Sequence, residues 1–101
     1  MTIIEGIKNK KGRVLIPDSS RNDLAGFFKN DLGFTTGAEI GCLIGQFTVG
    51  FCQQGLKMYA IDSWQIFDDY LHPRGQARLD EQFASATKRL APYDCKIIRA
   101  F

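Results

Sequence analysis

Carboxylates and glycines that could bind a ligand stand at the ends of two predicted strands. The segment Glu39-Ile40-Gly41-Cys42-Leu43-Ile44-Gly45 closes one apolar run, and Asp62 closes the next one along the chain. In a parallel α/β sheet, ligands bind outside the carboxyl ends of the strands. Gly41 and Gly45 would allow a tight turn and a close approach of the backbone to such a ligand. We therefore expect a binding site at this edge of the predicted sheet.

The spacing between the glycine turn and Asp62 is that of a ribose-binding site. Asp62 lies 21 residues after Gly41. A carboxylate about 20 residues beyond the turn has two oxygens that accept hydrogen bonds from the two adjacent hydroxyls of a ribose. The alternative for Asp62 is a helix or loop cap, and the alternative for Glu39 is a strand-end carboxylate paired with a surface lysine.

The glycine pattern narrows the class of ligand. Its form is G-x-x-x-G, which lacks the glycine that lets the backbone approach a dinucleotide pyrophosphate in G-x-G-x-x-G. The chain also has no Gly-Lys-Ser/Thr loop for a nucleoside triphosphate. A ribose-bearing ligand without phosphate fits better, and S-adenosylmethionine is the common one. Glu39 would then meet its cationic amino-acid group, directly or through water.

Alternating strands and helices are predicted to position these residues. Short apolar runs predict strands, and amphipathic stretches between them predict helices. A first helix with an N-cap signature at Ser20 and Asp23 precedes this region and stops at Gly33. The order strand–helix–strand–helix–strand implies a parallel sheet with right-handed crossovers. The predicted elements are a helix over 18–33, strands over 35–41, 57–62 and 95–101, and helices over 46–54 and 76–92.

The first 17 residues predict a β-hairpin ahead of this unit. The runs "TIIEGI" (2–7) and "RVLIP" (13–17) flank "KNKKG", a turn of hairpin length. A chain of 101 residues favours one small domain. We therefore expect a single α/β domain, with a hairpin over 1–17 followed by a helix and a βαβαβ unit over 18–101.

Four motifs in this order resemble the N-terminal half of a family of class I S-adenosylmethionine-dependent methyltransferases. In that family an Arg-x-x-Leu helix precedes a strand ending Glu-(Ile/Val)-Gly-x-x-x-Gly-x-(Phe/Ser)-(Ser/Thr). A second strand ends in Asp-(Pro/Ser)-Trp, and a helix ending Leu-Ala-Pro-Tyr leads into the third strand. The matching positions are Arg21 and Leu24, Glu39 to Thr48, Asp62-Ser63-Trp64, and Leu90 to Tyr93, within a resemblance that covers about residues 20–101.

The resemblance implies a fold, a cofactor and a set of binding residues. The fold would be the first part of a three-layer, Rossmann-like parallel sheet, and the cofactor would be S-adenosylmethionine, bound weakly. No catalytic or metal-binding residue is implied within this chain. The implied cofactor-binding residues are Glu39, Gly41, Cys42, Leu43, Gly45, Asp62, Ser63 and Trp64.

Each of these residues would have its own place around the cofactor. Glu39 and the glycine turn would form the wall on the methionine side. Asp62 would bind the ribose hydroxyls, and Ser63 and Trp64 would lie close to the adenine. For Trp64 the alternative is a packing anchor, which is the usual role of a lone tryptophan.

The family pattern also implies what this sequence lacks. The family's sheet normally has seven strands, whereas this sequence stops after the third predicted strand. We therefore expect a truncated, methyltransferase-like protein that retains the cofactor-binding half and is inactive alone. Acceptor specificity would lie in the missing half, so the resemblance implies no methyl acceptor.

A non-catalytic module that self-associates is the alternative function. In the family order the first strand is central and pairs with a fourth strand. Without that fourth strand it becomes an exposed apolar edge, a natural site for pairing with another copy unless the N-terminal hairpin covers it. We therefore expect a homo-oligomer joined through this edge or the adjacent apolar face. A nicotinamide-binding half-domain is disfavoured by the glycine spacing.

Composition excludes several other classes. The net charge of +2, from 13 Lys+Arg against 11 Asp+Glu, is too balanced to suggest a nucleic-acid partner or an anionic membrane surface. The longest charge-free apolar run, 40–52, is shorter than the roughly 20 residues of a membrane-spanning helix. The three cysteines, Cys42, Cys52 and Cys95, include no C-x-x-C pair, which argues against a disulfide framework or a zinc site. A reducing, cytoplasmic setting fits this usage.

Overall fold

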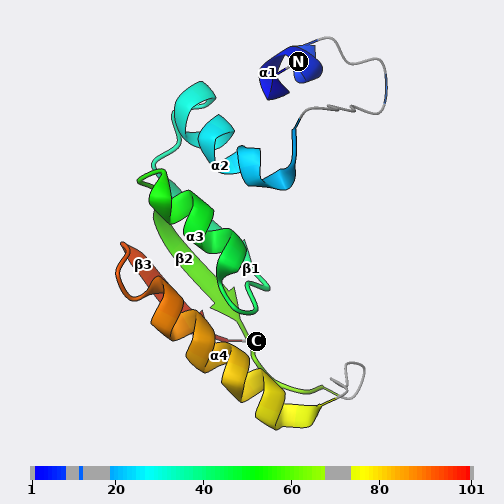
Figure 1. Cartoon of the computed structure of the whole chain (residues 1–101), viewed down its shortest axis with the longest axis vertical. Helices are drawn as coiled ribbons and strands as arrows, with labels where there is room; N and C mark the ends of the chain where they lie inside the picture. The colour runs from blue at the N-terminus through cyan, green and yellow to red at the C-terminus, as the bar shows by residue number, and fades with distance from the viewer. Residues whose placement is uncertain (1, 9–11, 13–18, 68–73, 101) are drawn as a thin grey trace.

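The computed structural model describes residues 2–8, 12, 19–67 and 74–100 (Figure 1). Within them, η1 is a 3₁₀ turn and η2 is a π-helical turn. From β1 onward the order is strand, helix, strand, helix, strand, which confirms the predicted alternation. The elements are α1 Ile3–Lys8, η1 Arg21–Asp23, α2 Leu24–Gly26, η2 Phe27–Asp31, β1 Thr36–Ile40, α3 Gln46–Gln53, β2 Lys57–Asp62, α4 Gly75–Leu90 and β3 Cys95–Arg99.

The three strands form one all-parallel sheet in the order β1-β2-β3, as the alternation predicted. The register places Ile40, Ile61 and Ile98 in one row across the sheet. Because the strands are parallel, their carboxyl ends meet at a single edge. The glycine turn after β1 and Asp62 at the end of β2 therefore lie at the same edge.

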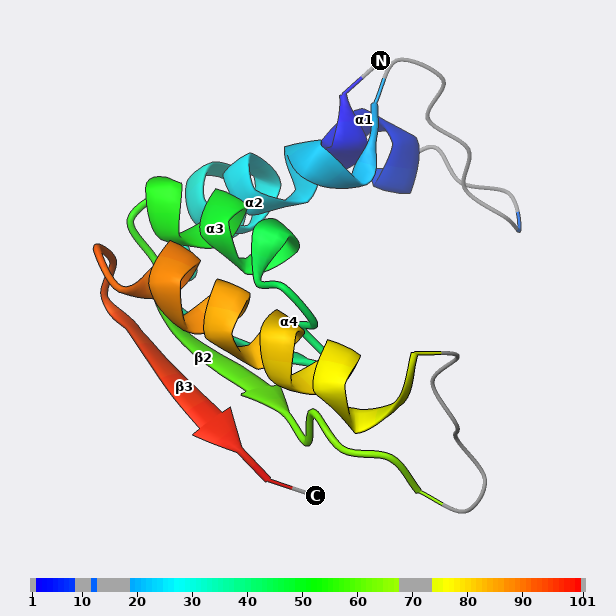
Figure 2. The ribbon, with the colours of Figure 1, turned by 60° about the horizontal axis from the view of Figure 1, so that its bottom comes forward.

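The helices α3 and α4 pack on the same face of the sheet, with α2 beside α3 (Figures 1 and 2). Strands added in one direction by crossovers of one hand place their connecting helices on one face. The described residues consequently form two layers, and the third layer that we expected is not seen among them. The opposite face, which we call the open face, carries the row Ile40, Ile61 and Ile98, of which Ile40 is 83% exposed.

The hydrophobic core lies between the sheet and these helices. Side chains alternate along β2, so that Met58 and Ala60 turn to the helices and are buried while their neighbours are less buried. Phe51 of α3 packs edge-on against Phe47 and stacks with Phe28 beside the same core. The fully or nearly buried core residues include Leu56, Met58, Ala60, Trp64, Leu79, Ala86 and Leu90.

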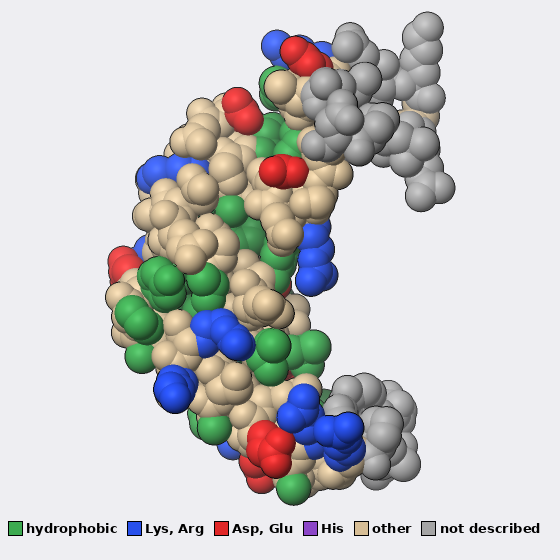
Figure 3. Space-filling model, in the orientation of Figure 1, with side chains coloured by type: hydrophobic (Ala, Val, Ile, Leu, Met, Phe, Trp, Pro, Cys, Tyr) green, Lys and Arg blue, Asp and Glu red, His purple; other side chains and the backbone are tan. Residues whose placement is uncertain are grey.

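The molecular surface mixes charges and apolar groups. On the face drawn in Figure 3, Lys and Arg side chains are dispersed among acidic and apolar ones rather than gathered into one patch. Among the described helices, none combines the length and the apolar character needed to cross a bilayer.

The N-terminal segment is helical, so the prediction that a first hairpin strand lies there is wrong. Residues Ile3–Lys8 form α1 where a strand was expected over 2–7. The Thr2 N–H donates to Glu5 Oε2 at 2.9 Å, and the Glu5 N–H donates to Thr2 Oγ1 at 3.2 Å. This reciprocal cap satisfies two amides of a first helical turn and favours the helix. The second predicted strand, 13–17, lies outside the described residues.

The helix predicted over 18–33 is present in a distorted form. Ser20 and Asp23 form the predicted capping box, in which the Ser20 N–H donates to Asp23 Oδ2 at 2.7 Å. The α-helical turn α2 then widens into η2, where the Leu32 N–H donates to a carbonyl five residues earlier. Gly33, with φ of +71°, ends the helical segment as predicted.

Gly45 lets the glycine turn approach α4 closely. It precedes α3 as its N-cap, with φ of +76°. A Cβ at this position would lie 3.0 Å from Leu90 Cδ1 and 3.6 Å from the Ala86 Cα. The left-handed backbone and the lack of room both call for glycine. Gly50, inside α3, has nothing within 4 Å of the equivalent point.

We predict opposite effects of alanine at these two glycines. Gly45→Ala should lower the free energy of unfolding by about 1–3 kcal/mol, because it adds backbone strain and crowds Leu90. Gly50→Ala should be neutral or raise it by up to about 1 kcal/mol, because alanine is the better helix former. Urea denaturation of both variants checks this, and equal effects at the two sites would contradict the packing described.

Candidate functional site

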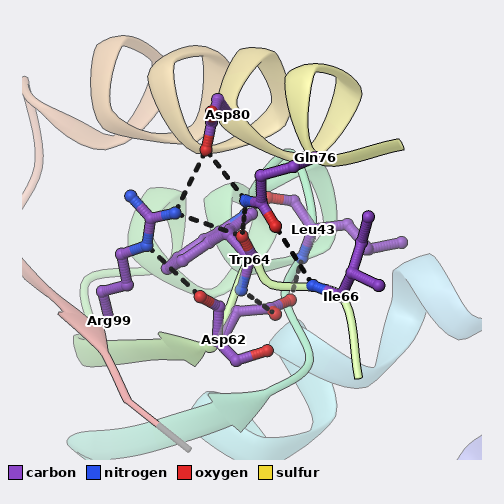
Figure 4. Close-up of polar contacts among 8 residues, drawn as sticks. Leu43, Asp62, Trp64, Ile66, Gln76, Asp80 and Arg99 are labelled. Atoms are coloured by element: carbon purple, nitrogen blue, oxygen red, sulfur yellow. Dashed lines mark hydrogen bonds and ion pairs between the residues drawn. The ribbon is translucent and has the colours of Figure 1, made fainter. Parts of the chain in front are cut away.

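The Asp62 carboxylate joins the glycine turn to the loop after β2. Its Oδ2 accepts a hydrogen bond from the Leu43 N–H at 3.0 Å, and its Oδ1 accepts one from the Trp64 N–H at 3.0 Å (Figure 4). The indole Nε1–H of Trp64 donates to the Leu43 carbonyl at 2.8 Å. Three hydrogen bonds therefore lock Leu43, Asp62 and Trp64 together at the carboxyl edge of the sheet.

The backbones of both residues that donate to Asp62 are left-handed. Leu43 has φ of +49° and Trp64 has φ of +47°. Such a conformation costs roughly 1–2 kcal/mol for a residue with a side chain. Hydrogen bonds to a charged group are among the stronger ones in proteins and offset this cost. Asp62 is thus the residue that maintains the local geometry of the edge.

Side chains from α4 and β3 hold the other side of the loop (Figure 4). The Trp64 carbonyl accepts from Gln76 Nε2 at 2.7 Å and from the Arg99 guanidinium at 3.1 Å. Asp80 Oδ1 accepts from the same two side chains, at 3.0 and 3.2 Å. The hydrogen bonds from Gln76 and then Arg99 lower the pKa of Asp80.

Glu39 is directed towards α3. It is half-buried, and its Oε1 accepts a hydrogen bond from the hydroxyl of Thr48, whose side chain is fully buried. Glu39 also lines a cavity of about 370 Å³ beside β1, together with apolar side chains of α2 and α3. Its carboxylate is therefore fixed by the fold rather than held by a surface lysine.

The other residues expected to bind the cofactor lie in different environments. Gly41, with φ of +81°, has open space where a Cβ would stand, whereas a Cβ on Gly45 would meet Leu90 and Ala86 of α4. The Leu43 side chain is 48% exposed, and Cys42 beside it is buried. Trp64 is 1% exposed and packs edge-on against Phe83, with ring centroids 4.8 Å apart.

Ser63 lies between Asp62 and Trp64 and is half-buried, with its carbonyl accepting from Arg99 Nε at 3.3 Å. The structure thus brings Leu43, Asp62, Ser63 and Trp64 into one hydrogen-bonded cluster. The Trp64 indole offers a ligand almost no surface, so it serves as a packing anchor in this arrangement.

The remaining acceptor capacity of Asp62 defines what the edge can bind. A carboxylate has about four lone-pair positions, and two of those on Asp62 are used by the Leu43 and Trp64 amides. The others can accept two hydroxyl groups. A Cβ at Gly41 would meet nothing within 4 Å, so the turn leaves room at that residue, and a diol is the chemistry that the free acceptor positions of Asp62 favour.

Comparisons of the chain with protein-family models, with curated proteins and with solved structures gave no match.

Sequence reasoning missed the residues that support the site. Arg89 of α4 donates to the carbonyl of Ile44 in the glycine turn, and Arg99 holds the Ser63 and Trp64 carbonyls. Only the strand register, which pairs Asp62 with Arg99, brings Arg99 to the site, and a single sequence does not reveal it. Asp68, Asp69 and His72 lie outside the described residues.

Burial makes two thiols resistant to ionisation. Burial, and then the negative charges of Asp62 and Glu39, raise the pKa of the Cys42 thiol to about 12 from its ordinary 9.0. Burial and the neighbouring Cys95 raise the pKa of Cys52 to about 12 as well. The folded protein therefore keeps both protons at pH values where the unfolded chain loses them.

We predict that the protein loses stability as the pH rises above 9. Between the unfolded and folded pKa values, each thiol lowers the free energy of unfolding by about 1.4 kcal/mol per pH unit, because only the unfolded state ionises. Urea denaturation at pH 8, 9 and 10 measures the slope, and Cys42→Ala should make it shallower. An identical slope in Cys42→Ala would contradict the raised pKa.

Proposed function

We propose that this chain binds S-adenosylmethionine at the carboxyl edge of its sheet, as the cofactor-binding part of a methyltransferase-like, Rossmann-like α/β unit. The observation that carries the proposal is Asp62, a strand-end carboxylate beside a glycine turn, fixed by two backbone amides and retaining acceptor positions for two hydroxyls. The proposal concerns cofactor binding, and it assigns no catalytic residue to this chain.

The chemistry of the turn favours a ligand without phosphate. Arg89 of α4 contacts the turn, but its guanidinium donates to the Ile44 carbonyl rather than being directed at a ligand phosphate. Within the turn, the Leu43 amide donates to Asp62 and is not free for an anion. A neutral ribose suits this edge better than a pyrophosphate, and the negative charges of Asp62 and of Glu39, which accepts from Thr48, favour a cationic ligand such as S-adenosylmethionine over an anionic one.

The proposal predicts that affinity depends on the ribose hydroxyls. Adenosine and S-adenosylmethionine should bind, and 2′,3′-dideoxyadenosine, which lacks both hydroxyls, should bind about 100- to 10,000-fold more weakly, since hydrogen bonds to a charged acceptor contribute roughly 1.5–3 kcal/mol each. Isothermal titration calorimetry measures the affinities of these ligands. Only the unaltered protein is used, so the result does not depend on whether a variant folds.

Variants separate Asp62 from other carboxylates. Asp62→Asn should abolish the preference for the diol, while Glu81→Gln, which removes an exposed carboxylate paired with Arg78, should leave it unchanged. Circular dichroism confirms that both variants are folded. Equal affinities for adenosine and its dideoxy analogue, or no binding of either, would overturn the proposal.

Self-association through the edge of β1 is the second function that an observation favours. Among the described strands, β1 has β2 as its one neighbour. The Lys57 N–H donates to the Thr35 carbonyl and the Gly41 N–H donates to the Ile61 carbonyl, so odd-numbered residues of this segment pair with β2. The backbone groups of Thr36, Ala38 and Ile40 accordingly point away from β2.

The surroundings of this edge suit an added strand. A cavity of about 370 Å³ lies beside it, lined mainly by apolar side chains, among them Phe28, Phe34 and Phe47. We propose that a second copy pairs here, β1 against β1, antiparallel about Ala38. Residues 36, 38 and 40 of each copy then face residues 40, 38 and 36 of the other, which satisfies all of these outward groups.

A charge at the edge should abolish this pairing. We predict that Ile40→Lys, at an 83% exposed position, makes the protein monomeric, because a lysine on an edge strand opposes strand addition. Ile7→Lys, at a 41% exposed position in α1, should leave the oligomer intact. Sedimentation at micromolar concentration checks this, and a monomeric unaltered protein would exclude the pairing.

A further inference from the structure

Both backbone polar groups of Trp64, its N–H and its carbonyl, are hydrogen-bonded to side chains. Its N–H donates to Asp62 Oδ1, and its carbonyl accepts from Gln76 Nε2 at 2.7 Å and from Arg99 at 3.1 Å. The Ile66 N–H donates to Gln76 Oε1 at 3.1 Å, which extends the same support by two residues. The left-handed backbone at Trp64 is thereby clamped between β2, β3 and α4 (Figure 4).

Arg99 donates hydrogen bonds to three acceptors of this cluster and lies over one aromatic ring. Its Nε donates to the Ser63 carbonyl at 3.3 Å, and one terminal nitrogen donates to both the Trp64 carbonyl and Asp80 Oδ1. Its guanidinium carbon lies 4.7 Å from the ring centroid of Phe83. A planar fork with several fixed donors makes such a set of contacts, and the single ammonium of lysine does not.

The strand register explains why Arg99 reaches the loop. Arg99 pairs with Asp62 across β2 and β3, and the Ala100 N–H donates to the Asp62 carbonyl at 3.0 Å. Arg99 therefore contacts the carbonyls of Ser63 and Trp64, while the N–H of Trp64 donates to the Asp62 side chain. A shift of the Ser63 and Trp64 peptides would move the amide that orients the Asp62 carboxylate.

We propose that Arg99 is a positioning residue that sets the Asp62–Trp64 loop and, through it, the orientation of the Asp62 carboxylate. The contacts form one continuous path, from the guanidinium to the Trp64 carbonyl, from the Trp64 N–H to Asp62, and from Asp62 to the Leu43 amide. The consequence for ligand affinity rests on the proposed S-adenosylmethionine site, whereas the consequence for the loop does not.

A purely stabilising role for Arg99 predicts a different result from a positioning role. If Arg99 only adds stability, its loss lowers the urea midpoint but leaves the folded loop as it was. A positioning residue changes the folded state itself. Trp64 is the one tryptophan of the chain, and its indole N–H is bonded to the Leu43 carbonyl, so its resonance reports the state of the loop without any ligand.

The experiment compares Arg99→Gln and Arg99→Lys with Arg78→Gln as the matched control. Arg78 also forms an ion pair, with Glu81 at 3.1 Å, and its side chain is 39% exposed, the same fraction as that of Arg99. The indole N–H resonance of Trp64 is recorded by NMR for each folded, ligand-free protein. We expect a shift in both Arg99 variants and none in Arg78→Gln, and an unshifted resonance in Arg99→Gln would overturn the inference.

Calorimetry with S-adenosylmethionine then tests the link to the site. Arg99→Gln and Arg99→Lys should each weaken binding on the order of tenfold, the loss expected when a charged hydrogen bond is misaligned. Unchanged affinity in a variant with a shifted Trp64 resonance would overturn the link between loop and carboxylate. If the unaltered protein binds no S-adenosylmethionine, the proposed function fails while the resonance still decides the role of Arg99.

Discussion

The hydrogen bonds that Asp62 accepts from the Leu43 and Trp64 amides are the constraint on which the carboxyl edge of this sheet depends. They hold two left-handed, non-glycine residues and fasten the turn after β1 to the loop after β2. The helix α4 completes the arrangement, since it packs against Gly45 and, through Gln76, holds the Trp64 carbonyl. A ligand at this edge would meet a surface that is already organised.

The alternation of strands and helices was predictable because each element carries a local signal. The apolar run ending at Asp62 predicted the bounds of β2, and the periodic apolar residues over 76–92 predicted α4, which ends at Leu90, two residues before Pro92. The capping pair Ser20 and Asp23 was recognised from spacing alone. The parallel sheet follows from that alternation, because crossover helices bring successive strands side by side in the same direction.

Other features depended on signals that were overlooked or that only the folded chain contains. Thr2 and Glu5 have the spacing of a helix cap, yet the apolar run after Thr2 favoured a strand. The third layer was expected from the family resemblance, whereas the described strands add in one direction and leave one face open. The contacts of Arg99 arise from strand register, which local sequence does not encode, so the support of the site could not be predicted.

The proposed binding requires Asp62 to hold the turn and the loop while it accepts hydrogen bonds from a ribose. A crystal structure of the protein with bound adenosine tests it most directly. We expect both ribose hydroxyls within hydrogen-bond distance of the Asp62 carboxylate, with the Leu43 and Trp64 amides still donating to the same group. Adenosine bound elsewhere, or an Asp62 side chain that has released those amides to reach the ribose, would contradict the account.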